Sequence, residues 1–274
     1  MDGIISKLES ELDLMEASKE QIRADSDKQL LENNDENGEE YSIVGDYNEI
    51  ENVYFAFIDV LGFSKIFGAG AKDKDRKKTL AEGYKDIFNY FFSLIGSSQA
   101  LRLTANTCAG QTSDSLYFYT DRTDMMIEFI KIYSHFSLYA MSKNIFFRGG
   151  IAKGCLFKNA PYQFFGDSII KAYSLESEIS KNPIITVDSS ACIGLSEEPI
   201  FGKMKKEDEI NQRCYIDPFY GWGSEMDIHL EEGFKCKTID YSAIERIIDE
   251  NLIRFEYDEK NYQKYLFLKK KMPK

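Results

Sequence analysis

The sequence predicts an α+β fold, in which a mainly antiparallel sheet has helices packed on one face. Residues 53–58 are six apolar residues in an unbroken run rich in aromatic and β-branched types, which is typical of a strand buried on both faces. Residues 80–95 and 123–142 repeat apolar side chains at helical spacing. The predicted elements follow the order β-α-β-β-α-β-α-β, which favours the ferredoxin-like arrangement of one such sheet.

The composition is that of a globular protein with an acidic surface. Of its 274 residues, 43% are hydrophobic and 14% are aromatic, enough for one large domain with a sizeable core. The net charge of −12 makes nucleic acid a poor partner, because binding it requires basic surface that displaces counterions. A triphosphate substrate is still compatible with this charge, since metal ions can supply positive charge locally.

The cysteines and the first residues indicate the compartment. Five scattered cysteines without a CxxC pair argue against a zinc site or a disulfide framework, and fit a reducing cytoplasm. The start MDGIISKLESE lacks the apolar segment of a signal peptide. No window approaches the roughly 18 apolar residues that span a bilayer. We therefore expect a cytoplasmic protein that has no membrane segment.

Residues 1–40 are predicted to form a helix followed by an acidic linker. Four apolar residues of this helix have the 3-4-3 spacing of a coiled-coil seam: Ile5, Leu8, Leu12 and Met15. A helix laid on the domain body explains the same spacing equally well. We expect the main domain at 41–195, and a C-terminal extension at 196–274 that packs on it.

The other elements are predicted in chain order from apolar patterning and turn residues. They are a basic helix start at 72–79, a strand at 101–108, a turn at Ala109-Gly110, a strand beginning at Asp114, strands at 145–154 and 184–187, a helix at 165–179, a loop-rich stretch at 197–237, and a helix at 241–251 before a Tyr/Lys-rich end.

Two strand ends carry candidate metal ligands. Asp59 ends the buried strand, and Asp114 begins a strand that could pair with it. Two carboxylates converging at one sheet edge can hold hard cations and clamp a phosphoryl displacement, while the amides of the turn after Asp59 can cradle phosphate oxygens. Either Asp taken alone is explained about equally well as a cap or turn residue.

Four segments occur in the order and spacing of one family: FIDVLGFS (57–64), SDSLYFY (113–119), RGGIAKG (148–154) and FGDSIIKAYSLE (165–176). Over roughly residues 50–195 they resemble the class III nucleotide cyclase catalytic domain, and most closely the pyrimidine cyclases of bacterial Pycsar anti-phage systems. The resemblance implies a class III cyclase fold with the cyclase catalytic domain at 41–195.

The resemblance also implies roles for particular residues. Two metal ions, Mn²⁺ or Mg²⁺, would be held by Asp59, Asp114 and the backbone carbonyl of Val60. The nucleotide would lie beside Phe57, with its phosphates on the turn of Gly62, Phe63 and Ser64. Arg148 would help to bind the triphosphate; an ordinary surface arginine is the alternative for this residue.

Two positions depart from the family pattern. Class III adenylyl and guanylyl cyclases carry an Asn and an Arg where this chain has Ile170 and Ser174. Neither side chain can stabilise an anionic transition state, so that role would pass to Arg148 or Lys171. The Lys/Asp pair that reads adenine is also not evident. The departures favour a pyrimidine substrate, UTP before CTP, and leave a purine cyclase or a catalytically inactive binding module as alternatives.

The activity implied is cyclisation of a nucleoside triphosphate. The ribose 3′-OH attacks the α-phosphate and pyrophosphate leaves, so no protein nucleophile is needed. The cyclic UMP or CMP product would act on a separate effector protein in anti-phage defence. Because class III cyclases build their sites between two catalytic domains, we expect a head-to-tail homodimer. Its interface would use the segments near Asp59 and the 165–176 helix, whose Ile169, Ile170 and Ala172 are more apolar than a solvent-facing helix requires.

Overall fold

The computed structural model describes residues 47–63, 74–101, 106–160, 163–208, 213–224 and 227–273. These residues belong to one compact unit, Tyr47–Lys274. The predicted N-terminal helix, its seam and the acidic linker up to Asp46 lie outside the described residues, as does Ser64.

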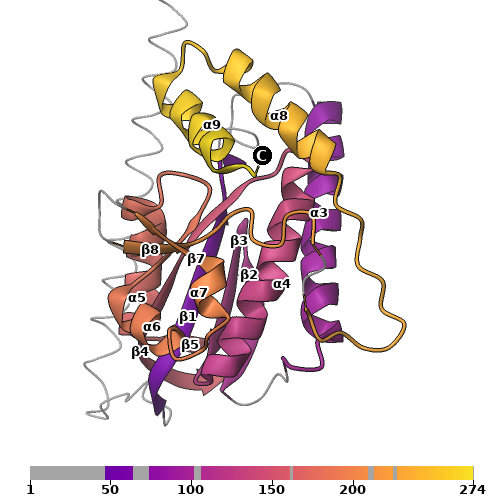
Figure 1. The fold of residues 1–274 in the computed structure, drawn as a ribbon. Coiled ribbons are helices and arrows are strands. Elements are labelled where there is room, and N and C mark those ends of the chain that lie inside the picture. Colours follow the sequence, from indigo (N-terminus) through magenta and orange to yellow (C-terminus); the bar gives the residue numbers. More distant parts are fainter. Residues whose placement is uncertain are drawn as a thin grey trace, which may run out of the picture. The chain divides into compact units, whose positions relative to one another are not determined.

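One sheet with the strand order β2-β3-β1-β4-β6-β8-β7 organises the described chain, and β5 pairs with β4 (Figure 1). The strands are β1 Asn48–Val60, β2 Thr107–Thr112, β3 Ser115–Thr120, β4 Phe147–Ala160, β5 Gln163–Phe165, β6 Ile185–Val187, β7 Lys205–Asp208 and β8 Arg213–Ile216. All pairs are antiparallel except β4 with β6. The prediction of an α+β fold with a mainly antiparallel sheet is confirmed.

Helices alternate with these strands along the chain, and two more follow the last strand. They are α3 Lys74–Ser97, α4 Thr123–Met141, α5 Asp167–Ser174, a π-helical turn η1 Leu175–Ile179, α6 Ser189–Leu195, α7 Phe201–Met204, α8 Tyr241–Arg254 and α9 Glu259–Lys271. None of the described helices is both long and apolar enough to cross a bilayer.

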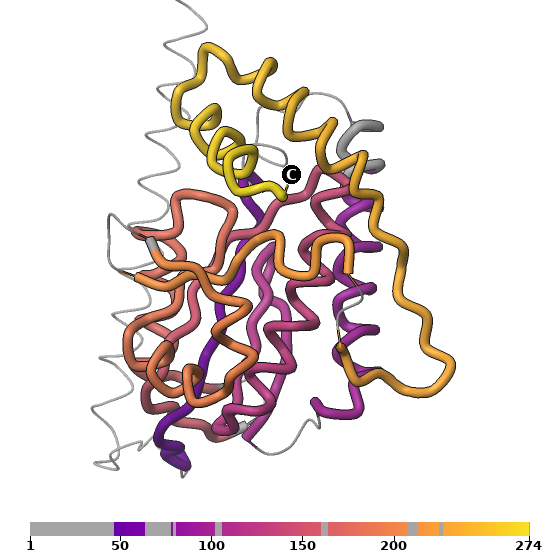
Figure 2. Tube along the Cα trace, viewed as in Figure 1, coloured from indigo at the N-terminus to yellow at the C-terminus, as the bar shows by residue number. Residues whose placement is uncertain are grey.

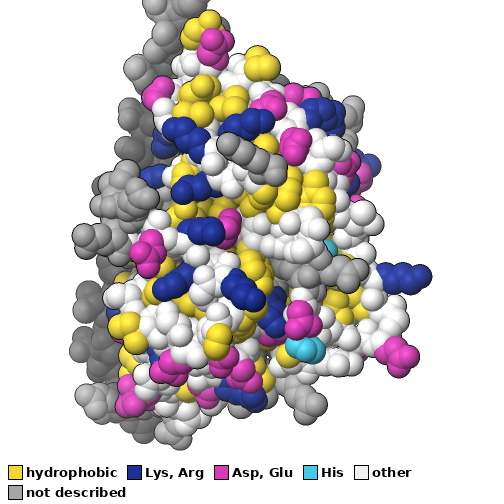
Figure 3. All heavy atoms as spheres, in the orientation of Figure 1, with side chains coloured by type: hydrophobic (Ala, Val, Ile, Leu, Met, Phe, Trp, Pro, Cys, Tyr) yellow, Lys and Arg dark blue, Asp and Glu magenta, His cyan; other side chains and the backbone are white. Residues whose placement is uncertain are grey.

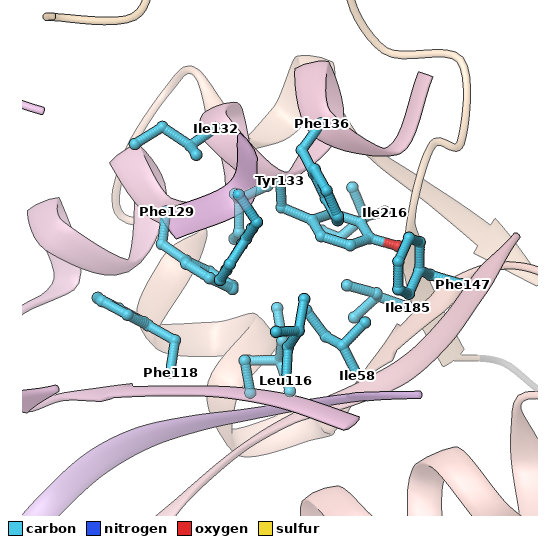
Figure 4. Close-up of a cluster of buried hydrophobic side chains, with 14 of the residues drawn as sticks. Ile58, Leu116, Phe118, Phe129, Ile132, Tyr133, Phe136, Phe147, Ile185 and Ile216 are labelled. Atoms are coloured by element: carbon cyan, nitrogen blue, oxygen red, sulfur yellow. The ribbon is translucent and has the colours of Figure 1, made fainter. Parts of the chain in front are cut away.

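The first face of the sheet packs on α3 and α4. Because side chains alternate along a strand, Tyr54, Ala56 and Ile58 of β1 all point to this side and join its core. Figure 4 shows how densely aromatic rings fill the layer: Phe118 of β3 stacks on Phe129 of α4 with ring centroids 4.3 Å apart. This core fixes β1, the strand that carries Asp59 next to its last residue.

The second face is covered by α5 and η1, so helices lie on both faces rather than on one as predicted. Val53 and Phe55 of β1 form a smaller cluster here with Ala172 and Leu175. Gly150 of β4 allows this packing, since a Cβ there would lie 2.3 Å from the carbonyl oxygen of Ala172. Patterning alone did not reveal the second layer, because α5 is only eight residues long.

Two local predictions need correction. Ala109 and Gly110 lie inside β2, and the turn is made by Ser113, whose φ is +56°, together with Asp114. Strands β7 and β8 lie within the stretch predicted as loops; they are four residues each, too short for a periodic signal. The Tyr/Lys-rich end forms α9.

The C-terminal helices α8 and α9 lie at the end of the sheet where β1 ends (Figures 1 and 2). Ile244 and Leu268 pack there with Leu138 of α4 and with Phe146, just before β4. Leu61, in the turn after Asp59, packs against the same cluster. The extension therefore supports the turn that follows the first candidate carboxylate.

Candidate active site

Three polar residues lie in a row across the neighbouring strands β3, β1 and β4. Asp59 is paired with Ser115 on one side and with Arg148 on the other. Directly paired residues of adjacent strands point to the same face of a sheet, so the three side chains share the face that carries α5 and η1. The row lies at the end of β1, next to the turn that Leu61 begins.

The Asp59 carboxylate has a different partner on each oxygen. Ser115 donates its hydroxyl hydrogen to Oδ1 at 3.0 Å. Arg148 Nη2 lies 3.8 Å from Oδ2, within ion-pair range but beyond a hydrogen bond. With 20% of its side chain exposed, Asp59 remains open to solvent on part of its surface.

The structure brings Asp114 beside Asp59. Burial, together with the negative charge of Asp114, raises the pKa of Asp59 from 3.8 to about 6, while Ser115 and Arg148 oppose the shift. Two carboxylates crowded in this way repel one another unless a proton or a cation lies between them. The second carboxylate comes from the tight turn between β2 and β3, where Ser115 begins β3.

The donor set fits a hard divalent cation. Asp59 and Asp114 offer carboxylate oxygens, and Val60 ends the strand at the same place, so the available ligands are the oxygen type that Mg²⁺ and Mn²⁺ prefer. In the described ranges, no group of three or more His, Cys, Asp or Glu side chains is arranged so that it could hold a metal ion by itself. The other ligands would have to be backbone and substrate oxygens.

The turn after β1 is held from both sides. Leu61 donates its backbone N–H to the carbonyl oxygen of Phe146 at 2.8 Å. Gly62 has φ +83°, a conformation that favours glycine. The Phe63 ring packs edge-on against Tyr84 of α3, with centroids 5.3 Å apart. The turn is thus anchored to the core, and the predicted phosphate-binding residue Ser64 lies outside the described residues.

The predicted nucleotide neighbour Phe57 lies on the same face as Asp59, one alternation earlier in β1. Its ring meets Tyr173 of α5 edge-on at 5.6 Å. Tyr173 is 55% exposed and Ile170, one of the two departures from the family pattern, is 67% exposed. The face beside the carboxylates is therefore apolar and open.

Arg148 is not an ordinary surface arginine, since only 24% of its side chain is exposed and its guanidinium lies between two carboxylates, Asp59 and Glu176. Lys171, the other predicted cation, is instead bound to Asp167 Oδ2 at 2.6 Å on α5. Of the two candidates, the structure therefore places Arg148 beside Asp59.

Three residues of this site were not singled out from the sequence. Ser115 and Glu176 both lie inside the quoted motifs, but a serine or a glutamate beside a strand or helix has no distinctive pattern. Tyr84 of α3 is the third: burial, followed by the charge of Asp114, raises its pKa to about 12. Its closeness to Asp114 depends on the packing of α3, which spacing does not reveal.

No protein-family model and no curated protein matches this chain. Similar solved structures include the monomeric guanylyl cyclase domain of the RhoGC fusion protein from Blastocladiella emersonii, with 15% identity, a TM-score of 0.43, and coverage of 62% of this chain and 96% of that chain. They also include adenylate cyclases from Trypanosoma brucei in their monomeric state, with 9% identity, a TM-score of 0.43, and coverage of 68% and 96%. A rhodopsin-guanylyl cyclase catalytic core with converted specificity, in complex with ATPαS, aligns at 16% identity and a TM-score of 0.41, covering 62% of this chain and 98% of that chain. Each of these similar structures is a nucleotide cyclase.

Proposed function

We propose that this protein is a metal-dependent nucleotide cyclase. The observation that carries the proposal is the juxtaposition of Asp59 and Asp114 with Arg148 at one end of adjacent strands. A pair of like charges next to a partly exposed cation is suited to a triphosphate and its metal ions, because the metals meet the carboxylates while the guanidinium meets phosphate.

Each residue contributes one function to this reaction. Asp59 and Asp114 would hold Mn²⁺ or Mg²⁺, and such ions, when bound, make the ribose 3′-OH more acidic and neutralise charge on the pyrophosphate. Arg148 binds the triphosphate and orients it, and the turn amides at Gly62 and Phe63 add hydrogen bonds to its oxygens. A bond forms between the 3′ oxygen and the α-phosphorus as the bond from that phosphorus to the pyrophosphate oxygen breaks.

We propose a pyrimidine triphosphate as the substrate, with UTP before CTP. Support comes from Ile170 and Ser174, which occupy the helix positions of the purine cyclases' Asn and Arg. An exposed isoleucine supplies no hydrogen bond and no charge, so a purine-type site is incomplete here. The cyclic UMP or CMP would serve as a cytoplasmic second messenger in anti-phage defence, acting on a separate effector protein.

We further propose that two chains pair head to tail and share their sites. The exposed apolar side chains Ile170 and Tyr173 lie on α5, and the exposed Phe165 ends β5 just before it. Burying these side chains against a second copy would also remove water from the carboxylates, which strengthens their interaction with a bound cation. On the face seen in Figure 3, basic, acidic and hydrophobic side chains are interspersed.

The test is to incubate the protein with each of the four nucleoside triphosphates and Mn²⁺, and to identify products by mass spectrometry. A cyclic pyrimidine monophosphate plus pyrophosphate, lost in Asp59→Ala and in EDTA, is the expected result. A cyclic purine product would retain the cyclase and overturn the pyrimidine assignment. Tight binding of a triphosphate without product would instead identify an inactive binding module, which the departures at Ile170 and Ser174 favour as the second candidate.

A further inference from the structure

Arg148 has a second carboxylate partner that none of the roles above includes. Its Nη2 lies 2.6 Å from Oε1 of Glu176 and 3.8 Å from Oδ2 of Asp59. One nitrogen is therefore shared unequally between the two carboxylates. Glu176 is the more buried of them, with 4% of its side chain exposed against 20% for Asp59.

The unequal distances have a direct electrostatic meaning. Attraction between opposite charges grows as the distance falls and as water is excluded, and both conditions favour Glu176 over Asp59. The guanidinium is thus drawn towards Glu176 and stops short of a hydrogen bond to Asp59. As a result, Oδ2 of Asp59 is left without a close cation, while Oδ1 is occupied by Ser115.

The position of Glu176 is built into the fold. It lies in the first turn of the π-helical segment η1, which follows directly on α5. Ser180, at the end of η1, donates its hydroxyl hydrogen to the carbonyl oxygen of Gly149 at 2.8 Å, and so fixes η1 to β4 beside Arg148. Gly150 lets the segment approach, because a Cβ there would lie 2.6 Å from the Cβ of Leu175.

The contact between Arg148 and Glu176 engages only one nitrogen of the guanidinium. Although Glu176 Oε1 is 2.6 Å from Nη2, it has no aligned hydrogen-bond donor in the described part of the chain, and Arg148 Nε has no acceptor there. The pair is therefore a single charge contact and not the two-pronged arrangement that an arginine can make with a carboxylate. With 24% of its side chain exposed, Arg148 can still meet a further anion on its solvent-exposed part.

We propose that Glu176 positions Arg148, holding its guanidinium away from Asp59 so that Asp59 can take a metal ion and Arg148 can take phosphate. The positioning follows from the distances alone, and its consequence for metal binding rests on the proposed function. In Glu176→Gln the buried charge is lost, which leaves Asp59 as the one carboxylate within ion-pair range of Arg148 among the residues that the structure describes. The guanidinium then closes on Oδ2 and competes with the cation.

The first measurement is the crystal structure of metal-free Glu176→Gln beside the wild type. We expect Arg148 Nη2 to move from 3.8 Å to hydrogen-bond distance of Asp59 Oδ2. Glu178→Gln is the matched control, since Glu178 is an exposed glutamate of the same segment, and it should leave Arg148 in place. An Arg148 that keeps its position in Glu176→Gln overturns the proposal.

The second measurement is the affinity for Mn²⁺ in the absence of nucleotide, determined by electron paramagnetic resonance. We expect Glu176→Gln to weaken binding about tenfold, the lower end for residues that orient metal ligands. Glu176→Asp keeps the charge and should bind better than Glu176→Gln; the opposite order would assign Glu176 a packing role only. In an Arg148→Ala background, Glu176→Gln should cause no further loss, because its effect passes through Arg148. An equal loss in that background overturns the proposal.

The two measurements separate this inference from the proposed function. If the wild-type protein binds no Mn²⁺ but Arg148 still closes on Asp59 in Glu176→Gln, the positioning role of Glu176 is supported and the proposed metal-dependent activity is contradicted. If the wild type binds Mn²⁺ and Glu176→Gln leaves both the affinity and Arg148 unchanged, the positioning role is contradicted and the proposed activity is unaffected. Should Glu176→Gln not fold, Glu176→Asp gives the same decision, because its shorter side chain draws Arg148 away from Asp59 less strongly. A loss of Mn²⁺ affinity in Glu176→Asp that is absent in an Arg148→Ala background supports the proposal, and an equal loss in that background overturns it.

Discussion

The two faces of the sheet differ in what covers them. On one face, α3 and α4 bury a continuous layer of aromatic side chains, including Phe118, Phe129 and Phe136, all of them fully inaccessible. On the other face, α5 and η1 cover a smaller cluster and leave Ile170 and Tyr173 exposed. The polar row at Asp59 lies on this second face.

This difference suggests that the first face mainly stabilises the fold, whereas the second face holds the candidate active site. Tight aromatic packing stabilises the first face and holds β1 rigid, whereas the second face keeps like charges close together and apolar groups in water. Strain of that kind is tolerated only where the surrounding structure is firm. We therefore expect substitutions on the first face to change stability, and substitutions on the second face to change activity, metal binding or association.

The largest effect on stability is expected from Phe129→Ala on the first face. It removes a ring that stacks on Phe118 at 4.3 Å, and large aromatic truncations in a core cost about 3–5 kcal/mol. Urea unfolding followed by circular dichroism measures the change. Tyr257→Ala is the control, since Tyr257 is 96% exposed, and it should change stability by under about 0.5 kcal/mol. A small loss for Phe129→Ala would contradict the assignment of stability to this face.

The next effect is on activity, from Arg148→Ala on the second face. Loss of the cation should lower kcat/KM by about 10²- to 10³-fold, because the guanidinium binds the charge that passes to pyrophosphate. Product formed from UTP with Mn²⁺ is the measurement, and Lys171→Ala, whose partner is Asp167, is the control. An unchanged kcat/KM in Arg148→Ala would remove Arg148 from the site.

A smaller effect is expected from pH. The pKa of Asp59 is raised to about 6 in the folded chain, so the folded state binds its proton more tightly than the unfolded state does. The contribution of Asp59 to the stability of the metal-free protein should therefore fall as pH rises from about 4 to about 6, by on the order of 2 kcal/mol after allowing for partial exposure. We expect the wild-type free energy of unfolding minus that of Asp59→Asn, both measured by urea unfolding in EDTA, to decrease over this interval. A difference that stays flat or rises would contradict the crowding of the two carboxylates.

The smallest effect on folding is expected from Ile170→Glu. Because Ile170 is 67% exposed, the free energy of unfolding should change by less than about 0.5 kcal/mol. If this face pairs with a second copy, the variant should nevertheless shift sedimentation towards monomer. Ile193→Glu on α6 is the control, since Ile193 is 72% exposed. A wild-type monomer with full activity would contradict the shared site.

The elements that pack on the first face of the sheet can be predicted from the sequence more fully than those on the second face. An unbroken apolar run predicts β1, and a helical stripe predicts α4, because burial on a large core imposes strong periodicity. The π-helical turn that aims Glu176 at Arg148 has no comparable pattern, and the four-residue strands β7 and β8 are too short to show one. Asp59 and Arg148 could be proposed from motifs, but their shared contact with Glu176 depends on tertiary packing.

Because β1 lies between β3 and β4, it can complete its pairing only after both of these later strands have been synthesised. Asp59 leaves the ribosome early, yet its partner Ser115 follows 56 residues later, and Arg148 and Glu176 later still. Until both neighbouring strands have formed, the apolar run of β1 has two unpaired edges, a state prone to aggregation. Strands β1, β3 and β4 bring Asp59 and Arg148 together, but Glu176 joins them only once η1 has been made, so a nascent chain that ends before Glu176 lacks the residue proposed to position Arg148.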